Sequence, residues 1–218
     1  SRARRLTQAR TLDRCLARQH RSRHEAAPSS MEATAPRALA PCRTLAAVKW
    51  GLQRGLKGRS HTVVLMLDEE IINEEPLLHG AINIITGSIL LLISEQWDQL
   101  THQYFLGMIR SYGRGWNIVL FEDRGSPHTA QRSRQLARDL HVDVRFLPVA
   151  TPELNSMDHL WRHVTAEALA NRPVRSIDET TDHVCTHIFM MSPEQRLNQA
   201  GVLAEKFWLR SLRDSKNF

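Results

Sequence analysis

Cysteine is scarce in this 218-residue sequence, which contains only Cys15, Cys42 and Cys185, three residues far apart along the chain. Such a set cannot form a disulfide framework and is typical of a reducing compartment. Long apolar runs are missing as well, since the most apolar stretch, residues 80–93, is too short to span a bilayer and contains polar residues. The sequence therefore predicts neither a disulfide-rich secreted domain nor a membrane protein.

A leader segment is also not expected, because no apolar stretch follows the arginine-rich first residues. The chain starts at Ser1 rather than at methionine, as a fragment or a trimmed product would. Hydrophobic residues make up 42% and charged residues 24%, which is typical of a globular protein with a packed core. The length suits one sizeable domain with an appendage.

Acidic residues are rare at the beginning of the chain. Residues 1–60 contain 14 Lys and Arg against 3 Asp and Glu, a net charge of +11, whereas the remainder contains 15 against 20, a net charge of −5. This asymmetry predicts a basic arm that binds a polyanion, joined to a body with another task; a solubilising tail is the alternative. We expect a short amphipathic helix in residues 1–24, a proline-containing linker at 25–41, and the body at 61–218.

Apolar patterns in the body alternate between strands and helices. Continuous β-prone runs predict buried strands at 62–67 and 116–121, a hairpin of 79–85 and 88–94 around Thr86-Gly87, and a strand at 142–147. Helices are expected at 97–112, 127–140, from Asn155 onward, 177–191 and 193–209. In the first of these, the core face is expected to carry Trp97, Leu100, Tyr104, Met108 and Tyr112. The order predicts an α/β domain with helices packed on a central mixed sheet.

Carboxylates follow two of the predicted buried strands. Asp68 comes after the first and Asp123 after the second, and side chains at such strand ends point into a crevice where ligands bind. Two carboxylates that close repel each other unless a cation lies between them, and magnesium prefers oxygen ligands of this kind. A third, Asp158, falls in the first turn of the helix that Asn155 can cap. Three carboxylates can hold two metal ions for phosphoryl transfer.

Each of these acids has a simpler interpretation. Asp68 and Asp123 could merely end strands, and Asp158 could be a capping-box acid opposite the N-cap. Three neighbouring acids also compete for the same roles, namely Glu69, Glu70 and Glu122.

Three motifs in order resemble the mariner-type transposases and the related bacterial insertion-sequence transposases of the DDE superfamily. LMLDEE supplies Asp68 and Glu69, IVLFEDRGSPH supplies Asp123 and His128, and FLPVATPELNSMDHLW supplies Asn155 and Asp158. Asp123 and Asp158 are separated by 34 residues, the close spacing typical of that family. The resemblance covers roughly residues 61–210.

The resemblance implies an RNase-H-like fold, a mixed sheet flanked by helices, and a transposase that cleaves DNA at element ends and transfers strands. It implies Asp68, Asp123 and Asp158 as ligands of Mg²⁺ or Mn²⁺, two ions in all. Glu69, His128 and Asn155 of the matching motifs are candidate auxiliary residues, and so is Arg124, which lies beside the second aspartate. The implied partner is double-stranded DNA, both terminal inverted repeats and target, bound by a homodimer. The implied location is the cytoplasm, at the nucleoid, if the protein is bacterial.

The sequence departs from the family pattern beside the second aspartate, where Arg124 replaces the usual asparagine. Its guanidinium could bind substrate phosphate, or could weaken metal binding by repulsion. Residues 1–60 also lack the paired helix-turn-helix units of full-length members. A catalytically decayed, DNA-binding descendant therefore stays open as an alternative, as does another RNase-H-like nuclease.

Histidines form two weaker patterns. His159 and His163 lie four residues apart, as zinc ligands can, but without the glutamate of the zinc-protease pattern, and we interpret them as polar-face residues. The alternation of His183, Cys185 and His187 is interpreted as incidental, because ligands so spaced on one helix do not converge.

Overall fold

The computed structural model describes residues 45–56, 61–71, 77–170 and 176–214. The expected helix of residues 1–24 and the linker of 25–41, with Cys15 and Cys42, lie outside the described residues. The described parts all fall within one compact unit, which spans residues 43–218. No helix of these parts combines the length and apolar character needed to cross a membrane.

Five strands form a mixed sheet in the order β3-β2-β1-β4-β5. They are β1 (Thr62–Ile71), β2 (Leu77–Asn83), β3 (Ile89–Ser94), β4 (Asn117–Glu122) and β5 (Val142–Phe146). β1, β2 and β3 pair antiparallel, while β1 pairs parallel with β4, and β4 with β5. The expected hairpin is confirmed, and Gly87 in its turn has φ +68°, a conformation that glycine adopts without strain.

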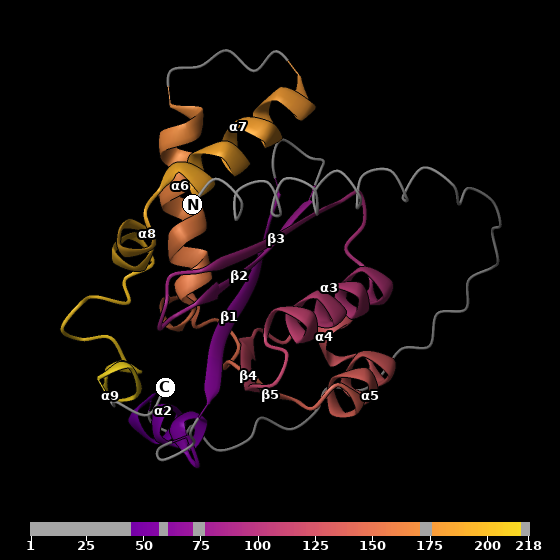
Figure 1. Cartoon of the computed structure of the whole chain (residues 1–218), viewed down its shortest axis with the longest axis vertical. Coiled ribbons are helices and arrows are strands. Elements are labelled where there is room, and N and C mark those ends of the chain that lie inside the picture. The colour runs from indigo at the N-terminus through magenta and orange to yellow at the C-terminus, as the bar shows by residue number, and fades with distance from the viewer. Residues whose placement is uncertain (1–44, 57–60, 72–76, 171–175, 215–218) are drawn as a thin grey trace, which may run out of the picture. The chain divides into compact units, whose positions relative to one another are not determined.

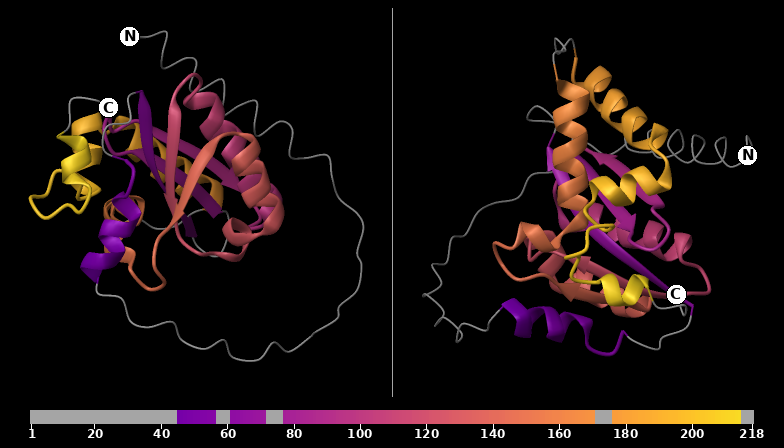
Figure 2. Two further views of the ribbon diagram at one scale, coloured as in Figure 1. Left: turned by 90° about the horizontal axis from the view of Figure 1, so that it is seen from below. Right: turned by 90° about the vertical axis from the view of Figure 1, so that its left-hand side faces the viewer.

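Helices cover both faces of this sheet (Figures 1 and 2). One face carries α3 (Gln99–Tyr112), α4 (Ser126–Thr129) and α5 (Gln131–Asp139). The other carries α6 (Ser156–Leu169), after the short 3-10 helix η1 (Pro152–Leu154), together with α7 (Ile177–Met190), α8 (Pro193–Gln199) and α9 (Arg210–Arg213). Two apolar cores result, one on each face. The α/β class expected from the sequence is confirmed.

The segment before the sheet belongs to this unit rather than to a separate arm. α2 (Leu45–Gln53) is followed by Leu56, which is fully buried in the core on the α6 face. Arg145 of β5 donates a 2.9 Å hydrogen bond to the carbonyl of Arg54, and Gln53 donates one to the carbonyl of Trp208. The compact unit therefore starts near residue 43, not at residue 61 as we expected.

The core face of α3 differs from the one expected. The buried residues are His102, Phe105, Leu106 and Ile109, whereas Leu100 and Tyr104 of the expected stripe are 63% and 52% exposed. The remaining members, Trp97, Met108 and Tyr112, are exposed or only partly buried. Both stripes have helical spacing, and the one packed on the sheet buries Phe105, Leu106 and Ile109. His102 on the same face lies 3.0 Å from the buried carboxylate of Glu122, which gives this polar side chain a partner.

Three boundaries also differ. β1 does not end at Asp68 but continues to Ile71, because β2 pairs with it over that length. The helix expected at 127–140 is broken at Ala130, whose backbone is not helical. The helix expected at 193–209 stops after Gln199, where Gly201 has φ +70°.

Candidate active site

Asp68 and Asp123 come together through the parallel register of β1 and β4. Met66 pairs with Phe121, so two residues further along each strand Asp68 and Asp123 are in line. Asp68 shares the strand face of Met66, which packs in the core beneath α6. The expectation that the two acids meet at one edge of the sheet therefore has a structural basis, although Asp68 lies within its strand rather than after it.

Asp123 is fixed by two hydrogen bonds to its Oδ1 atom. The amide of Gly125 donates at 2.8 Å and Nδ1 of His128 lies at 2.6 Å. The hydrogen bond from His128 holds the pKa of Asp123 below its usual value. A side chain at Gly125 would collide with Trp97 and crowd Asp123, so the close approach requires glycine here.

His128 connects this carboxylate to a second one behind it. Its Nε2 atom lies 2.9 Å from Oε1 of Glu69, and the imidazole is buried. Burial alone would lower the pKa of His128, but the hydrogen bonds to Asp123 and Glu69 raise it to about 11. The ring is therefore a buried imidazolium that donates from both nitrogens and orients Asp123.

Glu69 points to the opposite face of β1 from Asp68. Burial alone would raise its pKa, but hydrogen bonds from His128 and from His79, at 3.3 Å, hold it at about 2. His79 in turn lies 2.9 Å from the hydroxyl of Ser94 on β3. A buried polar layer thus supports the site from the α3 side, and sequence analysis missed it apart from His128 and Glu69.

Asp158 is brought to the site by the N-terminus of α6. Asn155 is the N-cap, as expected, and its Oδ1 accepts from the amide of Met157 at 3.1 Å. Its Nδ2 donates at 3.0 Å to the carbonyl of Leu67, directly before Asp68. Asn155 therefore ties the first turn of α6 to β1. The carboxylate of Asp158 forms an ion pair with the exposed Arg162 one turn later.

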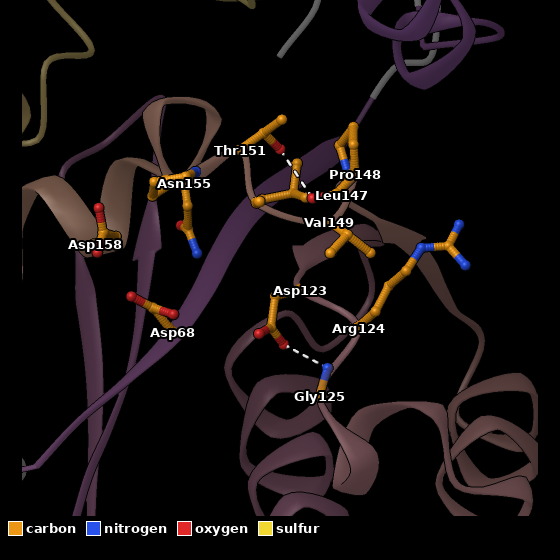
Figure 3. Close-up of a pocket in the computed structure, with 12 residues that line it drawn as sticks. Asp68, Asp123, Arg124, Gly125, Leu147, Pro148, Val149, Thr151, Asn155 and Asp158 are labelled. Carbon is orange, nitrogen blue, oxygen red and sulfur yellow. Dashed lines mark hydrogen bonds between the residues drawn. The ribbon is translucent and has the colours of Figure 1, made fainter. Parts of the chain in front are cut away.

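All three carboxylates line one pocket of about 360 Å³ (Figure 3). The loop between β5 and α6, residues 147–152, forms much of its wall. Burial raises the pKa of Asp68 to about 8, and the negative charges of Glu69, Asp158 and Asp123 add to the rise. Burial and the neighbouring carboxylates therefore favour the protonated form of Asp68 in the metal-free protein.

Arg124 lines the same pocket but its side chain points away from the carboxylates (Figure 3). The guanidinium lies 5.8 Å from the ring centroid of Phe146, a cation–π contact, and the residue is exposed. In this geometry the positive charge faces the outside of the pocket, where it could meet a phosphate.

The competing acids are placed elsewhere. Glu122 is fully buried and points towards α3, where it pairs with His102. Glu70 shares the strand face of Asp68 and does not line the pocket; burial raises its pKa, and the charge of Asp158 adds to the rise. Among the described acids, Asp68, Asp123 and Asp158 are those that line the pocket.

This arrangement suits a hard divalent cation. The donors are carboxylate oxygens that are partly buried and repel one another, the two effects that raise the pKa of Asp68. A cation among them would offset both effects. A helix N-terminus and an outward arginine complete a surface suited to phosphate groups. Three converging carboxylates on a mixed α/β sheet are an arrangement suited to metal-assisted phosphoryl transfer.

The model of a protein family described as DDE superfamily endonuclease matches residues 73–181, half of the chain. The chain therefore belongs to the family of DDE superfamily endonucleases. A search of the curated proteins gave no match.

Solved structures show the same fold. The catalytic domain of Mos1 mariner transposase is 17% identical, with a TM-score of 0.59 over 83% of this chain and 98% of that one. The Mos1 catalytic domain with raltegravir and magnesium is also 17% identical, with a TM-score of 0.58 over 77% and 94%. The Mos1 paired-end complex with the left transposon end is 14% identical, with a TM-score of 0.58 over 94% and 70%. The RNase-H-like fold expected from the sequence is confirmed.

Proposed function

We propose that this chain is the catalytic domain of a DNA transposase that cuts DNA at the ends of a mobile element and joins those ends to a target. The observation that carries the proposal is the convergence of Asp68, Asp123 and Asp158 on one pocket within a DDE endonuclease fold. The similarity to Mos1 structures, including a paired-end complex with transposon DNA, supports it.

The same three carboxylates would hold Mg²⁺ or Mn²⁺, the ions present in the similar Mos1 catalytic-domain structures. We infer two ions, because three carboxylates can serve a pair that draws the attacking oxygen and stabilises the leaving oxygen of an in-line displacement. The raised pKa of Asp68 indicates that the pocket favours a positively charged occupant.

The surrounding residues orient the three carboxylates and set their charge. His128 and the amide of Gly125 keep Asp123 ionised and fix its orientation. Asn155 sets the distance between α6 and β1, and so between Asp158 and Asp68. Arg162 neutralises Asp158 in the metal-free protein and is exposed enough to release it. Arg124 lies where it could contact a DNA phosphate at the rim.

DNA as the partner also accounts for the basic beginning of the chain. Residues 1–60 carry a net charge of +11, which would add phosphate contacts to those of the pocket. A homodimer on paired element ends and, if the protein is bacterial, a cytoplasmic location at the nucleoid complete the proposal.

The test is metal-dependent nicking of plasmid DNA that carries the sequences flanking the coding region. Asp68→Asn, Asp123→Asn and Asp158→Asn should each reduce nicking by more than about 100-fold, because each removes a ligand that stabilises the transition state. Glu70→Gln is the matched control, an acid two residues from Asp68 on the same strand face but outside the pocket, and should stay active.

Equal nicking by the wild type and the three variants would refute the site. DNA binding without nicking by the wild type, at any Mg²⁺ or Mn²⁺ concentration, would instead support the decayed-enzyme alternative.

A further inference from the structure

A cluster of histidine and glutamate side chains, the kinds that can ligate a metal, lies between α6 and α7, the pair of helices at the top of Figure 1. His163 and Glu167 lie one turn apart on α6, and His187 lies on α7. Nε2 of His163 is 3.4 Å and Nε2 of His187 is 3.2 Å from the same carboxylate oxygen, Oε2 of Glu167. Ligand atoms of the three residues all lie within 4.8 Å of one another.

The two distances to Glu167 match those between neighbouring ligands of a small cation. Zinc binds imidazole nitrogen and carboxylate oxygen at about 2.0–2.1 Å, so neighbouring ligands of a tetrahedral ion lie about 3.3–3.4 Å apart. The two distances to Glu167 of 3.2 and 3.4 Å need little adjustment. The side chains of His163 and His187 are 23% and 30% exposed, so an ion could enter and keep a water ligand.

The packing below the cluster holds the two helices in register. Val164 of α6 and both Val184 and Ile188 of α7 are fully buried in the same core. The three ligands are therefore presented by two helices whose relative position is fixed by apolar contacts, not by the ligands themselves. Such preorganisation lowers the cost of binding an ion.

We propose that His163, Glu167 and His187 form a site for a divalent transition-metal cation of the zinc class, which ties α7 to the helix that carries Asp158. Two imidazoles and one carboxylate favour zinc-class ions over magnesium, which selects oxygen ligands. The site is distinct from the carboxylate pocket in ligand chemistry and in residues, and its existence does not depend on the proposed transposase activity.

The competing interpretation needs no metal. Glu167 could simply accept hydrogen bonds from both histidines and so connect the helices. The two interpretations differ in a measurable way, because only a metal site predicts zinc binding that is lost when any one of the three residues is replaced.

The experiment titrates Zn²⁺ into the full-length, EDTA-treated protein by calorimetry, in excess Mg²⁺ so that the carboxylate pocket does not compete for zinc. Replacing a residue that only supports a metal ligand costs about 10–100-fold in affinity. Glu167→Gln and His187→Gln each remove a direct ligand and should therefore raise the Kd by at least about 100-fold. His141→Asn is the matched control, an exposed histidine whose φ of +55° asparagine tolerates, and should leave the Kd unchanged.

Two further measurements separate loss of the site from loss of the fold. Without metal, the wild type and Glu167→Gln should unfold at similar temperatures, and saturating Zn²⁺ should raise the Tm of the wild type only. Co²⁺ should give the visible absorption of a four-coordinate site in the wild type and not in Glu167→Gln. An unchanged Zn²⁺ affinity in Glu167→Gln and His187→Gln would overturn the proposal.

Discussion

At the residue scale, two adjacent acids of β1 show how strand alternation sets electrostatics. Asp68 faces other carboxylates and has a pKa of about 8, whereas Glu69 faces two histidines and has a pKa of about 2. Both are largely buried, so the difference comes from their neighbours rather than from desolvation. On one side of the strand, Asp68 is repelled by other carboxylates, and a bound cation would relieve that repulsion. On the other side, the charge of Glu69 is already balanced by its histidine partners.

The burial of Asp68, with this repulsion added to it, should be visible in the stability of the metal-free protein. The pKa of Asp68 is raised from 3.8 to about 8 by folding, so its contribution favours the fold at low pH and is lost as pH rises from about 4 to 8. Asp68→Asn should therefore unfold at higher urea than the wild type, with a gain on the order of 2 kcal/mol at pH 8.5 and a smaller one at pH 5.

The measurement is urea unfolding in EDTA at both pH values, with the exposed Asp139→Asn as control. A gain of equal size at pH 5 and pH 8.5 would contradict the repulsion. Saturating Mg²⁺ should stabilise the wild type and reverse the order of the two proteins.

At the element scale, the position of α6 against the sheet decides where Asp158 lies. Gly80 of β2 pairs with Asp68 and faces Met157 and Trp161 of α6. A Cβ atom at this position would lie 2.5 Å from Cε of Met157 and 2.6 Å from Cζ2 of Trp161. The absence of a side chain therefore permits the close approach of helix and sheet, and Asn155 then fixes the end of the helix.

Gly80→Ala should displace α6, because the rigid indole cannot retreat as the methionine can. We expect a loss of about 1–3 kcal/mol in the free energy of unfolding and weaker Mg²⁺ binding, since Asp158 moves with the helix. Gly107→Ala is the control, a position within α3 with open space for the methyl group, and should be neutral or stabilising by about 0.5–1 kcal/mol.

Denaturant unfolding and Mg²⁺ calorimetry on both variants check this expectation. If Gly80→Ala were as stable as the wild type and bound Mg²⁺ equally well, the packing of α6 on β2 would not position Asp158.

At the scale of the whole molecule, the boundary suggested by the charge distribution and the boundary set by packing lie at different residues. Charge suggests an arm that reaches residue 60, but residues 45–56 pack on the catalytic unit and Leu56 is part of its core. A truncation that tests the arm should therefore remove residues 1–42 only, which contain 9 Arg against 3 acidic residues. A longer truncation would also remove core contacts.

Removal of residues 1–42 should weaken DNA binding and flatten its salt dependence, because each lost phosphate contact reduces the slope of log K against log salt by about 0.9. Fluorescence anisotropy at several salt concentrations measures the slope, and an unchanged thermal unfolding curve shows that the catalytic unit is intact. Equal slopes for the 218-residue and truncated chains would show that this segment is not the DNA contact.

Much of the fold could be predicted because the signals are local. Continuous β-prone runs predict β1 and β4, Thr86-Gly87 predicts the hairpin, and Asn155 predicts the beginning of α6. Motif spacing and family resemblance selected Asp68, Asp123 and Asp158, which the structure places around one pocket, while their role as metal ligands stays a prediction.

The tertiary structure decided what depends on partners distant in sequence. Two stripes on α3 have equal helical spacing, and only packing against the sheet decides that the one with Phe105, Leu106 and Ile109 is buried. The end of β1 depends on the length of β2, and the opposite ionisation of Asp68 and Glu69 depends on which face meets His128. The sequence by itself determined which segments become strands, helices and ligand candidates, because those follow from neighbouring residues. Burial, register and pKa depend on contacts that exist only after the segments pack.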